Sequence, residues 1–427
     1  MKLRIEKAIY GGAGLARADG KAVFVPFALP GELVETHITE DRTSYANAEL
    51  DAVLEASPER VSQACQYFGE CGGCHYQHAS YAAQVEMKVQ ILRETLERAH
   101  LREIPPIAVV QGEPLGYRNR IRLHVDRASS QMCYKKRGSH ENLAVNECPI
   151  AAPVLEEALK TVQAKAKEWR LGECFEGIEF FTNPEQSEVL VTLWSGRGRD
   201  EVRSELKRLW PEMAASVRNI AGAAVLSSER GQQQSKMLAQ AGEQALTYQA
   251  AGRDYRVSLG SFFQVNRFLI DSLVDLVIAD SEGAVAWDLY AGVGLFARAL
   301  AARFKSVVAV ESAASSVRNL RHNLGEGSQR VVAVGTLDFL RRARAEGKAR
   351  PDFVVVDPPR AGLGKEVTAL LAEIRPAHVT YVSCDPATLS RDLKSLLDSG
   401  YHLTNMHMVD LFPQTFHLES VAMLSLG

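Results

Sequence analysis

Long apolar runs are missing from this 427-residue chain. No stretch approaches the roughly 18 consecutive apolar residues that a membrane-spanning helix needs, and the N-terminus lacks the apolar core of a signal peptide. We therefore expect a cytoplasmic protein with no membrane partner. The net charge is also small, −3 by formal count, so any binding of nucleic acid must come from local basic patches.

Cysteine is sparse as well. The chain has seven cysteines, an odd number, and three of them fall close together. This pattern does not suit a secreted disulfide scaffold and favours metal binding or catalysis. The seven are Cys65, Cys71, Cys74, Cys133, Cys148, Cys174 and Cys384.

Three regions differ in sequence pattern. Residues 1–56 hold short apolar runs broken by glycine and proline, which is typical of a small all-β barrel. The glycine run at 10–14 is no phosphate loop, because no helical pattern follows it. Residues 57–254 form a mixed α+β region that holds the cysteine cluster, a predicted helix at 81–100 and a basic strand at 117–123.

Residues 255–427 alternate regularly between the two kinds of secondary structure. The pattern predicts strands at 284–290, 306–311, 330–334, 353–357 and 378–383, and helices at 295–304, 315–324, 337–345, 365–373 and 389–399. Such alternation indicates a parallel, doubly wound sheet. Two last strands, 403–411 and 418–426, lack a helix between them and are expected to pair antiparallel. This multidomain α/β arrangement suits a class I, Rossmann-like methyltransferase domain.

A glycine-rich turn joins the first of these strands to its helix. The turn runs Asp288-Leu-Tyr-Ala-Gly-Val-Gly-Leu295, and Glu311 ends the next strand 19 residues after Gly292, where an acid can bind ribose hydroxyls. The alternative is a tight turn beside a surface acid. The glycine pattern is shorter than that of a dinucleotide site, which favours S-adenosylmethionine, a ligand without a pyrophosphate.

Two motifs follow later strands: Asp-Pro-Pro-Arg at 357–360 and Ser-Cys-Asp-Pro at 383–386. A single cysteine is most often a small buried apolar residue, but Cys384 falls at the edge where doubly wound sheets bind ligands. Addition of a thiolate to carbon 6 of uracil would make carbon 5 nucleophilic toward a sulfonium methyl group. A base must then remove the carbon 5 proton, and Glu419 is the candidate; its alternative is an ordinary strand carboxylate.

Other methyl-transfer chemistries fit less well. An aromatic residue after Asp-Pro-Pro would favour an exocyclic amine, but position 360 is Arg. RNA cytosine-5 methyltransferases usually carry a second cysteine beside the proline of the earlier motif, and none occurs near Pro358.

The clustered cysteines have the spacing Cys65-x5-Cys71-x2-Cys74. A fourth ligand must come from a distance, and Cys148, which precedes a proline, is the best candidate. By spacing alone four thiolates can hold an Fe–S cluster or Zn²⁺, or can remain free. Cys133 and Cys174 have no partner in this pattern.

Nearly the whole chain resembles the bacterial RNA uridine-5 methyltransferase family, in particular its Fe–S-containing rRNA branch. The motifs that carry the resemblance are 10–16 and 24–32 for a TRAM domain, 65–77, 117–119 and 134–148 for the cluster region, and 261–266, 357–360, 383–386 and 412–415 for the catalytic half. The resemblance implies that Cys384 is the nucleophile and Glu419 the base. It implies contacts to the cofactor or the target base from Gln264, Tyr290, Glu311 and Asp357, and a [4Fe–4S] cluster on Cys65, Cys71, Cys74 and Cys148.

Two departures from the family pattern concern the cofactor. Thr336 stands where an acidic or amide residue is expected, with Asp338 as a substitute, and Leu295 stands where some relatives have Asn.

The expected partner is RNA, and we expect the protein itself to be a monomer. Ribosomal RNA of the large subunit is favoured, because tRNA-specific bacterial relatives lack both the cluster and the TRAM domain; a tRNA target, or a non-catalytic RNA-binding cluster protein, are the alternatives. Candidate phosphate contacts, which could equally form a solvated face, are Arg118, Arg120, Arg122, Lys135, Lys136 and Arg137.

Overall fold

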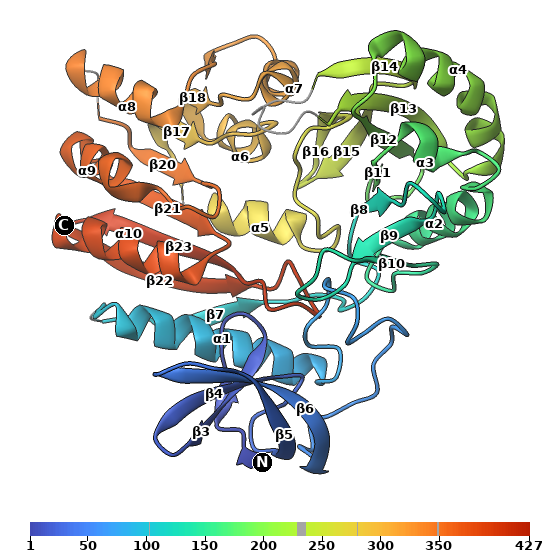
Figure 1. Ribbon diagram of the computed structural model, residues 1–427. Helices are drawn as coiled ribbons and strands as arrows, with labels where there is room; N and C mark the ends of the chain where they lie inside the picture. The colour runs from blue at the N-terminus through green and yellow to red at the C-terminus, as the bar shows by residue number, and fades with distance from the viewer. Residues whose placement is uncertain (102, 229–235, 280, 348–349) are drawn as a thin grey trace.

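The computed structural model describes residues 1–101, 103–228, 236–279, 281–347 and 350–427. Figure 1 shows a small N-terminal barrel, a central sheet flanked by helices and a large C-terminal sheet covered by helices. The multidomain α/β class expected from the sequence is confirmed. Among the described helices, none is both long and apolar enough to cross a membrane.

The N-terminal barrel has strands β1 (Lys2–Arg4), β2 (Lys7–Ala8), β3 (Ala13–Ala18), β4 (Lys21–Pro26), β5 (Leu33–Asp41) and β6 (Tyr45–Glu55). Their order is β1-β5-β6-β4-β3-β2. Because β1 and β2 follow one another along the chain and pair with β5 and β3, the two edges meet and the sheet closes. Part of β3 falls on the glycine run that the pattern assigns to a turn. Gly14 is needed there, since a Cβ would lie 2.8 Å from the Ile5 side chain.

The central sheet has the order β10-β9-β8-β11-β12-β13-β14. Its strands are β8 (Arg120–Val125), β9 (Met132–Lys135), β10 (Asn142–Ala144), β11 (Gly177–Thr182), β12 (Val189–Ser195), β13 (Ile220–Ser227) and β14 (Met237–Gly242), and its helices are α2 (Pro153–Lys165), α3 (Leu171–Cys174) and α4 (Arg199–Ser216). Apolar residues of α2 and α4 pack on one face. The hairpin of β15 (Ala245–Ala250) and β16 (Arg253–Ser258) packs near the other, where Tyr248 stacks on Phe181.

The C-terminal sheet has the order β19-β18-β17-β20-β21-β23-β22-β7. Its strands are β7 (Ile107–Val110), β17 (Gly283–Leu289), β18 (Phe304–Val310), β19 (Gln329–Val332), β20 (Phe353–Val356), β21 (His378–Ser383), β22 (Tyr401–Val409) and β23 (Glu419–Leu426). The first five predicted strands are parallel, and β22 and β23 pair antiparallel, as the sequence predicts.

Both faces of this sheet are buried. Val354 belongs to an apolar core with α8 (Thr336–Ala345), α9 (Gly364–Ile374) and α10 (Pro386–Asp398), whereas its neighbour Val355 belongs to the core with α5 (Ile270–Val277), α6 (Leu295–Leu300) and α7 (Ala314–Leu324). Burial on both sides explains the continuous apolar runs of the sequence.

The segment that contains α1 (Tyr81–Arg98) and β7 lies with the C-terminal sheet rather than with the central one. Residues of α1 join the core of α8 to α10, and β7 pairs parallel with β22 at the edge. Figure 1 shows α1 between the barrel and the C-terminal sheet. The predicted regions are therefore interleaved in space, because residues from within 57–254 complete the sheet of 255–427.

A buried ion pair fixes α1 to the end of β22. Lys88 Nζ lies 2.6 Å from Asp410 Oδ1, and both side chains have an exposed fraction of 0%. We expect Lys88→Met to lower the free energy of unfolding by roughly 3–5 kcal/mol, because it leaves a buried charge without a partner. Denaturant unfolding measures the loss. Lys394→Met is the control, since the Lys394–Asp398 pair is exposed and should cost less than about 1 kcal/mol; equal losses would contradict the argument.

Candidate active site

One cavity of about 690 Å³ lies at the carboxyl ends of β17, β18, β20 and β21. Its lining includes all six side chains that the sequence assigns to the cofactor, the base and the chemistry: Gln264, Tyr290, Glu311, Asp357, Cys384 and Glu419. Parallel strands present their carboxyl ends at one edge of a sheet, so residues that follow different strands meet there.

The glycine-rich turn forms one wall of this cavity. Tyr290 has a φ of 71°, a left-handed value that is strained for a residue with a side chain, and Gly292 and Gly294 have φ values of 56° and 95°. Behind the turn, the buried Asp288 carboxyl accepts a hydrogen bond from the Ala297 N–H at 2.7 Å. Burial raises the pKa of Asp288 to about 8, so this carboxyl is largely neutral near pH 7.

Glu311 ties the glycine turn to the next strand. One carboxylate oxygen accepts a hydrogen bond from the Gly292 N–H at 2.9 Å, and the other accepts from the Ser312 and Ala313 N–H groups at 2.7 Å each. A carboxylate has about four acceptor positions, and these three N–H groups use three of them. One position remains on the oxygen that Gly292 contacts, which suits a ribose hydroxyl.

Leu295 and Thr336, which depart from the family pattern, and the possible substitute Asp338 lie in different surroundings. Leu295 lines the cavity. Thr336 begins α8, and it opposes the rise that burial causes in the pKa of Tyr290. Asp338 does not line the cavity; its side chain is 62% exposed and lies 3.9 Å from Arg341, so the structure does not support it as a substitute contact.

Gln264 and Asp357 meet across the cavity. Gln264 Nε2 donates to Asp357 Oδ2 at 3.2 Å. Burial raises the pKa of Asp357 to about 7, against the opposing effect of this hydrogen bond. The Asn119 side chain donates to the Gln264 carbonyl, and the Asn119 N–H donates to that of Val265, each at 2.9 Å. Amide and carboxyl groups held in this way can read the polar edge of a base.

Cys384 and Glu419 lie at the same end of two paired strands. Ser383 of β21 is paired with Ser420 of β23, so Cys384 follows one strand where Glu419 begins the other. Burial, then Glu419 and Asp357, raise the pKa of the Cys384 thiol to about 11, which Arg360 partly opposes. Burial and Asp357 also raise the pKa of Glu419 well above its usual range. These surroundings favour the protonated form of both groups, and a positive charge in the cavity would favour their ionised forms.

Arg360 and His417 form a pair at the mouth that the sequence argument leaves without a role. The Arg360 guanidinium lies 3.1 Å from His417 Nδ1, and both residues line the cavity. Burial, then Arg360, lower the pKa of His417 to about 3, so the ring is neutral and can accept from the guanidinium. Since the two residues are 57 positions apart, no local spacing signals the pair.

The four predicted ligand cysteines surround a second, small cavity of about 80 Å³, whereas Cys133 and Cys174 do not line it. Burial raises the pKa of Cys74 to about 12 and that of Cys148 to about 11. Within the described part of the chain, no three His, Cys, Asp or Glu side chains lie close enough to hold a single metal ion. The thiols thus face a common space rather than a common point.

Two of the predicted phosphate contacts are engaged inside the protein. Arg118 lines the cysteine cavity, and Arg120 pairs with Glu179 at 3.2 Å while its guanidinium covers the Phe181 ring. These positions correct the expectation that both arginines face RNA. Arg122 and Arg137 are exposed and remain candidates.

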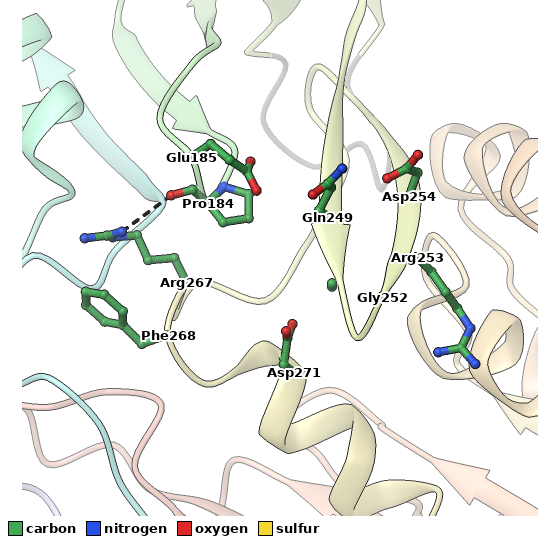
Figure 2. A pocket seen from close by; sticks show the side chains of 10 residues that line it. Pro184, Glu185, Gln249, Gly252, Arg253, Asp254, Arg267, Phe268 and Asp271 are labelled. Atoms are coloured by element: carbon green, nitrogen blue, oxygen red, sulfur yellow. Dashed lines mark hydrogen bonds between the residues drawn. The ribbon is translucent and has the colours of Figure 1, made fainter.

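A third cavity, of about 380 Å³, shares no lining residue with the first. Figure 2 shows Arg267 directed at the Pro184 carbonyl, with a distance of 3.4 Å, and Gln249 and Asp271 on other sides of the space. It has carboxylates and guanidinium groups but no thiol, and the predicted site residues lie elsewhere.

Comparisons with known proteins agree with the fold. The tRNA (Uracil-5-)-methyltransferase family matches residues 80–426, and the TRAM domain family matches residues 1–50. A solved structure of the Pyrococcus abyssi tRNA (uracil-54, C5)-methyltransferase, in complex with S-adenosyl-L-homocysteine, superimposes with a TM-score of 0.77 at 23% identity, over 99% of this chain and 100% of that one.

Two curated relatives match along almost their full length. The 23S rRNA (uracil(1939)-C(5))-methyltransferase RlmD of Vibrio parahaemolyticus is 34% identical over 99% of this chain and 95% of its own. An uncharacterized RNA methyltransferase of Aquifex aeolicus is 31% identical over 99% of this chain and 98% of its own.

Proposed function

We propose that this chain methylates a uridine of 23S ribosomal RNA in the cytoplasm. The chain belongs to the tRNA (uracil-5-)-methyltransferase family. It is an RNA (uracil-5-)-methyltransferase of the RlmD-like branch of that family. One observation carries the chemistry: Cys384 follows the end of β21 and Glu419 begins the paired strand β23, in the cavity that the glycine turn also lines. The target is supported by the RlmD relative, which aligns over 99% of the chain.

The proposed methyl donor is S-adenosylmethionine, whose sulfonium supplies an electrophilic methyl group. In this proposal the turn from Tyr290 to Gly294 lies along the nucleoside and Glu311 accepts a hydrogen bond from a ribose hydroxyl. The fixed carboxylate oxygens of Glu311 support this placement. So does the related fold from Pyrococcus abyssi, which was solved with S-adenosyl-L-homocysteine, the product of such a transfer.

The proposed reaction uses Cys384 as nucleophile. Its thiolate adds to carbon 6 of the uracil, and the electron pair of the 5,6 double bond moves toward oxygen 4 as an enolate. Carbon 5 then takes the methyl group. Glu419 removes the proton from carbon 5, the 5,6 double bond forms again and the thiolate leaves. Gln264 and Asp357 orient the uracil edge.

Mapping 5-methyluridine in the RNA of a deletion strain tests the target. We expect one uridine of 23S rRNA to lose its methyl group, and a plasmid that encodes the intact protein to restore it. Loss confined to tRNA would overturn the rRNA assignment and favour the alternative target that the Pyrococcus abyssi enzyme's name suggests. Unchanged rRNA and tRNA would overturn both.

Glu311→Ala should weaken binding of S-adenosylmethionine by roughly 1–3 kcal/mol, the range for hydrogen bonds to a charged group. Calorimetry on the purified protein measures this affinity. Asp338→Ala is a matched control, because that carboxylate lies outside the cavity. An unchanged affinity in the Glu311 variant would show that the ribose binds elsewhere.

We also propose that the cysteine cavity holds a [4Fe–4S] cluster. A single Zn²⁺ binds thiolates at about 2.3 Å, which requires the four sulfur atoms to converge on one point. Thiols around a space of about 80 Å³ fit a larger group better. Four cysteines fill the usual ligand set of such a cluster, so its role here would be structural, in holding the loop of Cys65, Cys71 and Cys74 to Cys148.

Protein purified without oxygen should be brown and contain about four iron and four sulfide per chain. Cys148→Ser should lose most of that iron, whereas Cys133→Ser should keep it, since Cys133 lies outside the cavity. Iron, sulfide and zinc analysis with absorbance spectra decides the matter. One zinc per chain without sulfide would contradict the cluster.

A further inference from the structure

Tyr10 of the N-terminal barrel reaches the strand end that carries Cys384. Its hydroxyl oxygen lies 3.5 Å from the Cys384 carbonyl oxygen and 3.4 Å from Asp385 Oδ2, so these two acceptors share its single proton. Burial, then Asp385, raise the pKa of Tyr10, so its hydroxyl keeps the proton that it donates.

The acceptor Asp385 is itself a structural anchor of this strand end. Its other carboxylate oxygen, Oδ1, accepts hydrogen bonds from the Ala387 and Thr388 N–H groups at 3.0 and 2.9 Å, which caps the N-terminus of α10. Cys384 therefore lies between β21 and the capped N-terminus of α10. The Tyr10 side chain of the barrel contacts this turn.

The aromatic ring of Tyr10 touches the other catalytic segment. It meets the Phe416 ring edge-on at 5.4 Å between centroids, and Phe416 lies 4.3 Å from the His417 ring. The chain then continues from His417 to Glu419. One barrel side chain thus contacts both segments from which the proposed nucleophile and base arise.

The loop that carries Tyr10 is shaped for this approach. Gly11 and Gly12, which follow it, have φ values of 106° and 92°, and a Cβ on Gly12 would lie only 3.0 Å from His75 Cβ. Residues with side chains would strain the turn and push it away from the segment that holds Cys74.

An apolar core and an ion pair hold the barrel against the cysteine segment and α1. A small apolar core joins barrel residues Ala8 and Leu29 to the cysteine segment and to α1, and Tyr10 and Phe416 pack against it; its other members are Tyr76, Ala79, Met87 and Ile91. Lys7 also pairs with Glu94 of α1.

We propose that Tyr10 is a positioning residue for the methyl-transfer reaction: its hydroxyl fixes the backbone of Cys384 and the carboxylate of Asp385, so the barrel completes the active site in addition to any contact with RNA. The proposal rests on Cys384 being the nucleophile. Bond formation demands that the sulfur sit close to the carbon it attacks, and a displacement of about 1 Å can cost on the order of 100-fold in rate.

Tyr10→Phe tests the hydroxyl while keeping the ring. We expect the single-turnover rate of covalent adduct formation with 5-fluorouridine RNA to fall about 10-fold, with the dissociation constants for RNA and S-adenosylmethionine unchanged within about twofold. Tyr45→Phe is the control, because this other barrel tyrosine packs on Phe24, away from the cavity. An adduct rate equal to that of the unaltered protein would overturn the proposal, as would weaker RNA binding with an unchanged rate for the bound RNA.

A second measurement separates positioning from a loss of fold. The rate at which iodoacetamide alkylates Cys384, followed by mass spectrometry of its peptide across pH 7–10, should change in Tyr10→Phe while the unfolding temperature stays the same. A lower unfolding temperature with an unaltered alkylation profile would mean that Tyr10 only stabilises the barrel. If Cys384→Ala still forms adduct, the proposed nucleophile fails; if that variant is inactive and Tyr10→Phe is normal, only the positioning role fails.

Discussion

Cys384→Ala should form no covalent complex with RNA and should lower the rate of 5-methyluridine formation by at least about 10⁴-fold. Without addition at carbon 6, carbon 5 of uracil has too little nucleophilicity to take the methyl group, and the rest of the site only binds and orients the reactants. Mass spectrometry of digested RNA measures the product, and denaturing gels show the complex.

The control for this variant is Cys174→Ala, which removes a partly exposed thiol outside the active-site cavity and the cysteine cavity. It should methylate at the rate of the unaltered protein. The calorimetric affinity of Cys384→Ala for S-adenosylmethionine should also be unchanged, because Cys384 follows β21 and Glu311 follows β18, with β17 and β20 between these strands. A Cys384→Ala rate within tenfold of normal would show that the reaction does not proceed through this sulfur.

The gathering of four active-site residues was predictable because they follow strands of a doubly wound sheet. Asp357 and Cys384 each come after an apolar run, and such runs become parallel strands with adjacent carboxyl ends. Tyr290 and Glu311 follow β17 and β18 in the same way, on the other side of the point where the strand order reverses. The local pattern of apolar runs is enough to predict these four positions.

Other features depend on contacts that no local pattern encodes. The four-residue strand β7 pairs with β22, about 300 positions away, and its pattern of partly buried and exposed residues carries no sign of that partner. Arg118 looks like its basic neighbours in the sequence, yet it precedes β8, forms isolated bridges with Ala151 and Asn266, and lines the cysteine cavity. Tyr10 stands in a glycine-rich loop typical of a turn, and only the packing of the barrel on α1 brings it to Cys384.

Glu419→Gln should fail at a later step than Cys384→Ala and therefore leave a different product. The amide has the shape of the carboxyl group but cannot take a proton from carbon 5, so addition and methyl transfer proceed while elimination stops. We expect a methylated protein–RNA adduct that survives denaturation, and turnover lowered by roughly 10²–10⁴-fold. Mass spectrometry of the adduct should show the added methyl group.

The raised pKa of Glu419 does not conflict with its role as base. Burial and Asp357 raise the pKa of Glu419 in the free protein, and a positive charge in the cavity would lower the pKa of Glu419 and of Cys384 together. Two carboxyl groups that share a site lose their protons in succession, so Asp357 is the alternative base. Asp357→Asn should therefore weaken binding of the target uridine without trapping an adduct. If Glu419→Gln turns over normally and Asp357→Asn accumulates the methylated adduct, the base is Asp357.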